Sequence, residues 1–164
     1  MIIAEVTAAD WAAAGAGWTH LPYLARFRAA RLPLSWDGFF TGRHHAVLEG
    51  QRRAIKAIRA GATGAKVHTV VQEYFKSLGY KTGLVKGVYV GFFHGTGHGL
   101  GYDIHEDPAL STRNPLPLVA GNAVTVEPGL YYPGIGGCRF EDCVVVTKKG
   151  CEFLSSHPTD WEIA

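Results

Sequence analysis

Apolar residues recur at helical spacing in two neighbouring segments of the first half of the chain. The first segment runs from about residue 43 to 59, and one of its faces is made of Val47, Ala54, Ile55 and Ile58. The second has its apolar face at Val67, Val70, Val71, Tyr74, Phe75 and Leu78. Thr63 is a typical N-cap for the second helix, and Gly61 and Gly79 are suited to the two helix ends. The pattern therefore predicts a pair of amphipathic helices.

The second half of the chain is rich in β-branched and aromatic residues, as strands are. Three segments there are predicted to be strands: VYVGFFH (88–94), NAVTVEP (122–128) and RFEDCVVVT (139–147). The segment MIIAEV at the start of the chain is also predicted to be a strand, and a buried one. The turn KKG before CEFLS predicts a hairpin, with Gly150 at a position of positive φ. This order of elements predicts an α+β fold, with helices packed on one face of a curved, mostly antiparallel sheet.

Length and composition narrow the class of protein. A chain of 164 residues with 47% hydrophobic content is expected to form one domain, residues 1–164. The net charge of +2 indicates neither a nucleic acid nor an anionic membrane as partner. No apolar run approaches the ~20 residues of a membrane helix, and the first residues lack the basic flank of a signal peptide. Three cysteines without a CxxC motif favour a reducing compartment, so we expect a cytoplasmic protein.

The stretch HGTGHGLGYDIHEDP, residues 94–108, places three histidines on a glycine-rich backbone. Glycine allows a backbone to approach a ligand closely, so His98, which lies between two glycines, is suited to direct its ring into a site. Two carboxylates follow in strand-like segments. Glu127 precedes Pro128, which ends its strand, and Glu141 lies within an apolar strand, where a carboxylate is costly to bury unless it is paired or metal-bound.

One imidazole and two carboxylates are a reasonable ligand set for Zn²⁺, Mn²⁺ or Co²⁺. Alternation along the strand places Arg139, Glu141 and Cys143 on one face and Phe140 and Asp142 on the other. The three candidate ligands are far apart in the sequence and form no local metal motif. Pairing of Glu141 with Arg139 or a lysine, with the histidines satisfied by hydrogen bonds, explains the same residues. The residues alone do not decide between a metal site and this pairing.

Three segments together resemble the C-terminal half of the pita-bread metallopeptidase family: HGTGHGLGYDIHEDP, TVEPGLYYPGIGGCRFEDCVVVT and GCEFLS. Within that family they are more similar to the Xaa-Pro branch, prolidase and aminopeptidase P, than to methionine aminopeptidase. The stretch IRAGATGAKVHTVVQEYFKSLGY resembles the helical pair that precedes the histidine motif, so the likeness covers roughly residues 43–156. The resemblance implies half of a pita-bread fold and hydrolysis of peptide bonds by a metal-bound hydroxide.

The resemblance also implies roles for particular residues. His98, Glu127 and Glu141 match metal ligands, with Glu141 in the position that bridges two metals. His94 and His105 match histidines that line the substrate pocket and hydrogen-bond the scissile peptide and its developing oxyanion. With Glu127 as a proton shuttle, the expected catalytic residues are His94, His105 and Glu127. Arg139 is expected to support a ligand glutamate without touching the metal.

The chain departs from the family pattern in two respects. The two-metal site needs two further aspartates, but Glu5 and Ala16 fall at their positions and Asp10 has the wrong spacing, so residues 1–36 are a divergent N-terminal region. The chain also begins where the second half of the family's domain begins. We therefore expect a truncated domain that forms a homo-oligomer or pairs with a separate chain supplying the missing half.

Three hypotheses about function follow. The first is an Xaa-Pro-type peptidase that acts on small peptides with a divalent Mn, Co or Zn ion, one ion rather than two. The second is a metal-free, creatinase-like hydrolase of a small amide, which the missing aspartates favour. The third is a non-catalytic binding or assembly module that retains the fold, which the absent half-domain favours. Whether the chain is an enzyme is left open between them.

Overall fold

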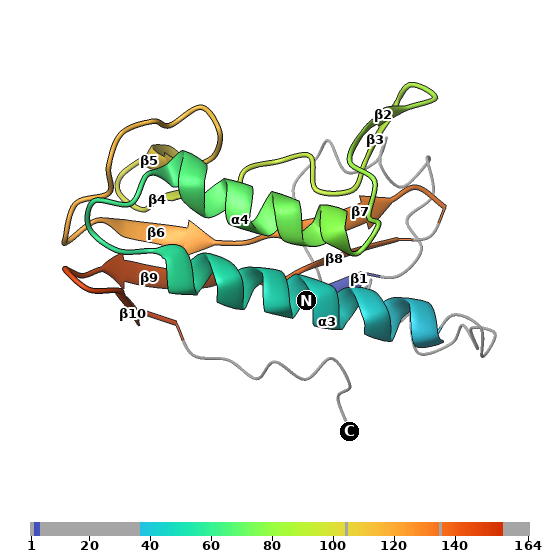
Figure 1. The fold of residues 1–164 in the computed structure, drawn as a ribbon, viewed down its shortest axis with the longest axis horizontal. Coiled ribbons are helices and arrows are strands. Elements are labelled where there is room, and N and C mark those ends of the chain that lie inside the picture. The colour runs from blue at the N-terminus through green and yellow to red at the C-terminus, as the bar shows by residue number, and fades with distance from the viewer. Residues whose placement is uncertain (1, 4–36, 104, 135, 156–164) are drawn as a thin grey trace.

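The computed structural model describes residues 2–3, 37–103, 105–134 and 136–155 (Figure 1). Two helices, α3 (Asp37–Ala57) and α4 (Gly64–Ser77), lie side by side on one face of the strands. The helix pair predicted from the apolar spacing is confirmed. Thr63 caps α4 as expected, because its side chain accepts a hydrogen bond from the backbone N–H of Lys66 at 3.1 Å. Neither helix is long and apolar enough to cross a membrane.

The strands are short and all of their pairings are antiparallel. They are β1 (Ile2–Ile3), β2 (Gly83–Val85), β3 (Val88–Val90), β4 (Gly97–Gly99), β5 (Glu106–Leu110), β6 (Ala123–Val126), β7 (Gly129–Tyr132), β8 (Gly136–Arg139), β9 (Asp142–Val146) and β10 (Cys151–Phe153). Among the described residues they form a five-stranded sheet in the order β10-β9-β6-β4-β5, a three-stranded sheet β1-β8-β7 and the β2-β3 hairpin. The α+β class and the antiparallel pairing are therefore confirmed.

Two short connections carry the chain between the larger sheets. Residues 127–128 join β6 to β7, and residues 140–141 join β8 to β9. Each connection contains one of the two candidate glutamates. The fold thus places Glu127 and Glu141 at the junction between the sheets, where the backbone leaves one ladder and enters the next.

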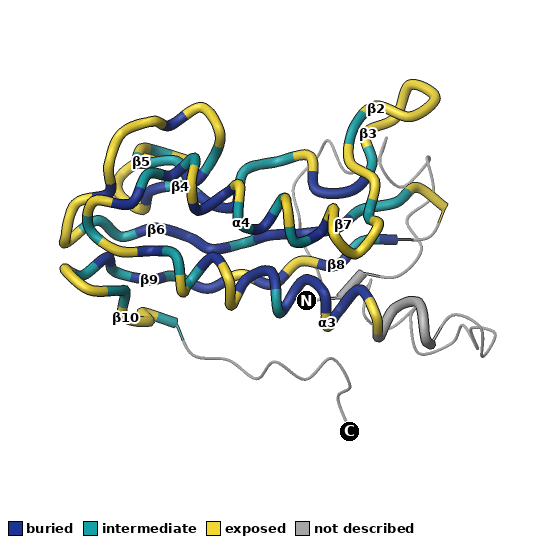
Figure 2. The backbone as a smooth tube through the Cα atoms, in the orientation of Figure 1, coloured by how far each residue is buried: buried dark blue, intermediate teal, exposed yellow. Residues whose placement is uncertain are grey.

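The core lies between the helices and the sheets. Figure 2 shows buried backbone along the inner sides of both helices and along β6 and β9, whereas the β2-β3 hairpin is exposed. The largest fully buried side chains come from α4, from two strands and from the loops, including the residue just after α3: Phe75, Phe92, Ile58, Leu110, Leu118 and Leu130. Removal of this apolar surface from water is the main stabilising contribution to the fold.

Three expectations about the strands and their turns need correction, and a fourth lies mostly outside the described residues. The segment 139–147 is not one strand, because it breaks between β8 and β9. The segment 88–94 is a strand only over Val88–Val90, in the exposed hairpin. Gly150 lies in the β9-β10 turn, but its φ is not positive. Of MIIAEV, residues 2–3 pair with β8, and the rest lies outside the described residues.

Candidate active site

An open cavity of about 490 Å³ lies beside β4 and the junction between the sheets. Five of the six residues singled out from the sequence line it: His94, His98, His105, Glu127 and Arg139. Glu141 is the sixth, and it is not among the lining residues. The fold therefore brings together side chains from segments more than one strand apart in the sequence.

Three further polar residues line the cavity, and the sequence did not single them out as site residues. They are Asp107 in β5 and Ser111 and Arg113 in the loop that follows. Residues 105, 107, 109, 111 and 113 all line the cavity. This two-residue period is that of one face of an extended segment. Alternation continued from His105 was the signal that would have found them.

His98 is placed by the close approach of β4 to β6. A Cβ atom at Gly97 would overlap the Thr125 backbone carbonyl, so only glycine fits there. The His98 backbone N–H donates to Thr125 Oγ1 at 3.0 Å, and its Nδ1 lies 2.9 Å from the Gly99 carbonyl oxygen. Because a carbonyl accepts, Nδ1 carries the proton and Nε2 faces Glu127 Oε1 at 3.2 Å. Two acceptors at this distance are stabilised by a proton or a metal ion between them.

His94 is largely enclosed by aromatic rings. Phe92, Phe93 and Tyr131 have ring centroids 5.4, 5.9 and 5.4 Å from its own. Burial lowers the pKa of His94, so the ring is neutral near pH 7. Its Nδ1 donates to the Gly95 carbonyl at 2.7 Å, while Nε2 is buried and has no hydrogen-bond partner among the described residues. In this tautomer Nε2 accepts a proton or hydrogen bond from a ligand rather than donating one.

His105 has an unusual backbone conformation. Its φ is 62°, in the left-handed region that few non-glycine residues occupy. The ring meets that of His98 edge-on, with centroids 4.6 Å apart. Residues in this region often occur at functional sites, because the surrounding structure must hold them there. With this backbone, the His105 ring contacts His98 and lines the cavity.

Arg139 lies between the two candidate glutamates. Its Nη1 is 3.6 Å from Glu127 Oε2, and its Nη2 is 3.7 Å from Glu141 Oε2. The alternation predicted from the sequence holds despite the strand break, since Arg139 and Glu141 are exposed while Phe140 and Asp142 are buried. Glu141 was expected to be buried in a strand, but its side chain is 41% exposed. Pairing with Arg139 rather than burial is therefore the main feature of its environment.

The described residues fit a metal ion only in part. The donor types are suitable, and His98 and Glu127 already face each other at 3.2 Å. Within the described ranges, however, no group of three or more His, Cys, Asp or Glu side chains is arranged to hold an ion. The guanidinium of Arg139 separates Glu141 from Glu127. Glu5, Asp10 and Ala16, which bear on the missing aspartates, lie outside the described residues.

The sequence model of metallopeptidase family M24 matches residues 39–148. The chain belongs to this family. Its members use divalent metals. The Xaa-Pro dipeptidase of Pyrococcus furiosus is 38% identical over 112 residues, which cover 68% of this chain and 30% of that protein. The chain thus spans about a third of the length of the curated relatives it matches. The resemblance inferred from the histidine and glutamate motifs is confirmed.

Solved structures show the same relationship. The X-Pro aminopeptidase from Thermotoga maritima has a TM-score of 0.64 and 42% identity, over 72% of this chain and 31% of that one. The prolidase from Pyrococcus furiosus has a TM-score of 0.65 and 35% identity, over 73% of this chain and 33% of that one. A methionine aminopeptidase from Rickettsia prowazekii, at 24% identity, shares the fold. The described elements therefore form part of a pita-bread domain.

Proposed function

We propose that this chain forms part of the active site of an Xaa-Pro-type metallopeptidase that acts on small peptides. The observation that supports this most strongly is the convergence of His94, His98, His105 and Glu127 on one open cavity in a member of family M24. Relatives that carry the names Xaa-Pro dipeptidase and X-Pro aminopeptidase support the substrate class.

His98 and Glu127 are the residues best suited to hold a divalent ion, with Glu141 as a third ligand if Arg139 moves aside. A bound ion of this kind lowers the pKa of its water and polarises a peptide carbonyl. We propose one Mn²⁺, Co²⁺ or Zn²⁺ rather than two. His94 contributes a neutral ring to the cavity lining, and we propose that this residue helps to orient the substrate. His105, whose ring contacts that of His98, is proposed to contact the substrate near the reacting carbonyl.

The β5 side of the cavity supports a short, charged substrate. Asp107 and Arg113 place charges of opposite sign along this wall, and Ser111 lies between them in the sequence. A free peptide of two or three residues carries an ammonium and a carboxylate at close separation. Complementary charges at a cavity wall bind such groups and orient the peptide bond between them.

Further polypeptide completes the site in this proposal. The two glutamates lie with Arg139 between them, and the matched part of this chain covers only 30% of the Pyrococcus furiosus relative. We infer that a second copy of this chain, or another chain, supplies the remaining walls and ligands.

The test is an assay of the full chain after dialysis against Mn²⁺, Co²⁺ or Zn²⁺, with Xaa-Pro dipeptides as substrates. We expect turnover that requires metal and that falls about 100-fold or more in Glu141→Ala, as for loss of a residue that supports a metal site. Glu152→Ala is the matched control, because Glu152 is an exposed glutamate on β10, away from the cavity. Absence of turnover with all three metals, or full activity of Glu141→Ala, contradicts the proposal.

One observation favours a second candidate, a non-catalytic binding module. Arg139 already pairs with both glutamates, so part of their negative charge is offset without a metal. In that case the purified chain binds none of the three ions, and Arg139→Leu lowers its stability. A metal-free, creatinase-like hydrolase differs from both, because its turnover of a small amide survives chelation.

A further inference from the structure

Gln51 is a polar residue on the apolar face of α3. It follows Val47 by four residues and precedes Ala54 by three, so it shares their inward face, and it is only 2% exposed. Burying an amide is costly unless its hydrogen bonds are made. The position therefore calls for specific partners across the helix-sheet interface.

Both partners of Gln51 are at strand ends that carry a candidate glutamate. Its Nε2 donates to the Val126 carbonyl at 3.1 Å and to Asp142 Oδ2 at 3.1 Å. Val126 is the last residue of β6, and Glu127 follows it; Asp142 is the first residue of β9, and Glu141 precedes it. Val126 and Asp142 are also directly paired across the two strands. One side-chain amide thus joins the pair of residues from which both glutamates extend.

The contacts around this pair continue on both sides. The second oxygen of Asp142, Oδ1, accepts from Ser155 Oγ at 2.7 Å, and Ser155 Oγ accepts from the Cys143 N–H at 2.9 Å. On the β6 side, the Glu127 N–H donates to the Thr96 carbonyl at 2.7 Å. Each strand end is therefore held by a local hydrogen bond, and Gln51 is the side chain that contacts both.

We propose that Gln51 is a positioning residue that sets the separation between Glu127 and Glu141. It lies behind the cavity rather than in its wall, and it acts through the backbone of Val126 and the carboxylate of Asp142. Arg139 lies 3.6 Å from Glu127 and 3.7 Å from Glu141. A small shift of either strand end therefore changes how the two glutamates share a cation, whether it is this guanidinium or a metal ion. The consequence for catalysis rests on the proposed function, whereas the positioning itself does not.

Two backbone amides report on local opening of the Val126–Asp142 pair, and a third amide serves as a reference. The Glu127 and Cys143 N–H groups flank it, each with its own hydrogen bond. The Val146 N–H, bonded to the Asn122 carbonyl at 2.8 Å, lies at the far end of the same two strands. In Gln51→Leu we expect hydrogen exchange at Glu127 and Cys143 to accelerate about tenfold or more relative to Val146, because the local opening loses its strongest restraint.

Two further variants make the result specific. Val47→Ala, one turn earlier on the same buried face, weakens α3 packing without touching either strand end, so it accelerates the three amides by the same factor. Gln51→Glu places a carboxylate against that of Asp142 and is expected to behave as Gln51→Leu does. Adding Asp142→Asn to Gln51→Glu restores a hydrogen bond between the two side chains but leaves the Val126 carbonyl without its donor, so we expect the Cys143 amide to slow again and the Glu127 amide to remain fast.

Equal acceleration of all three amides in Gln51→Leu, or no slowing of the Cys143 amide in the exchanged pair, overturns the positioning role. These measurements use the full chain without metal or substrate. A chain that fails to hydrolyse Xaa-Pro peptides but shows the expected exchange pattern contradicts the proposed function alone. A chain that hydrolyses them, with an unchanged rate in Gln51→Leu and uniform exchange, contradicts the positioning role alone.

Discussion

Glu127 is the residue at which the polar contacts of the cavity meet. Its carboxylate lies 3.2 Å from His98 Nε2, 3.6 Å from Arg139 Nη1 and 3.1 Å from the Thr125 hydroxyl that donates to it. The Thr125 hydroxyl also accepts a hydrogen bond from the His98 backbone N–H. One hydroxyl therefore orients both the backbone of His98 and the Glu127 carboxylate. The EPG motif predicts the glutamate. Thr125 was not predicted, because a threonine inside a strand gives no sign of which side chains its hydroxyl reaches.

His68 is a buried histidine in α4 that makes stability depend on pH. Its Nδ1 lies 3.1 Å from Thr96 Oγ1, and burial, with a smaller effect from His94, lowers its pKa from 6.5 to about 4. The folded state therefore binds this proton less readily than the unfolded chain does. Stability from this group is fully present above about pH 6.5 and is lost as the pH falls toward 4. The expected total is about 3 kcal/mol.

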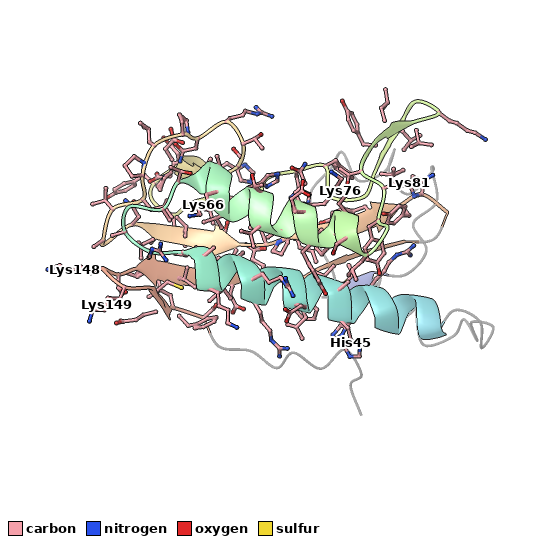
Figure 3. All side chains as sticks on the ribbon, viewed as in Figure 1. His45, Lys66, Lys76, Lys81, Lys148 and Lys149 are labelled. Carbon is pink, nitrogen blue, oxygen red and sulfur yellow. The ribbon has the colours of Figure 1, made fainter. Side chains whose placement is uncertain are left out.

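Urea unfolding at several pH values between 7 and 4 measures this effect. His68→Leu lacks the titrating group, so we expect its stability to fall less steeply with acid than that of the wild type. His45→Leu is the control, because His45 is exposed and projects from the outer side of α3 (Figure 3). An unchanged pH slope in His68→Leu shows that another group causes the acid sensitivity.

At the scale of elements, β4 depends on its glycines, of which Gly97 faces β6. Strand β4 lies between β5 and β6, and a Cβ at Gly97 would overlap the Thr125 carbonyl. We expect Gly97→Ala to destabilise the chain by more than about 3 kcal/mol, because the β4-β6 ladder that positions His98 has to separate. Thermal unfolding measures the change. Gly150→Ala is the control, since a Cβ there meets open space and its φ is not positive, and its effect is expected within about 0.5 kcal/mol.

The two helices were predictable because the apolar spacing and the caps agreed on their positions. The break between β8 and β9 was not. Exposure alternates without interruption from Arg139 through Val144, so the pattern is the same whether one strand or two are present. What moves the chain to the other sheet is the pairing of Asp142 with Val126, a contact between residues distant in sequence. Long-range pairing of this kind leaves no local signal.

The β2-β3 hairpin was missed for a different reason. Both residues of its loop, Lys86 and Gly87, have positive φ, at 50° and 83°, which is the type I′ geometry of tight hairpins. The sequence signal was the Lys-Gly pair between short apolar runs. It was weak because lysine seldom adopts positive φ. A surface hairpin also buries little, so no burial pattern marks it.

For the whole molecule, the described fold matches only about a third of each Xaa-Pro relative. The site residues that the sequence predicted lie together, yet three ligands do not close around an ion within the described ranges. The motifs report which side chains belong to the family's chemistry. In the proposed function, the site is completed by polypeptide that these motifs do not include, so the motifs do not predict its remaining ligands.

The exposed hairpin leads us to expect self-association of the full chain. Four of its apolar side chains, Leu84, Val85, Val88 and Tyr89, are 46–63% exposed, and the Tyr89 ring lies 5.8 Å from that of Phe93 at a tilt of 40°. Contiguous apolar surface of this kind favours contact with another chain.

Light scattering at tens of micromolar is expected to give a mass above that of one chain. Leu84→Ser combined with Tyr89→Ser should shift it toward the monomer. Leu116→Ser combined with Val119→Ser, which changes equally exposed residues elsewhere, should not. A monomeric wild type contradicts self-association and leaves a different chain as the partner that completes the site.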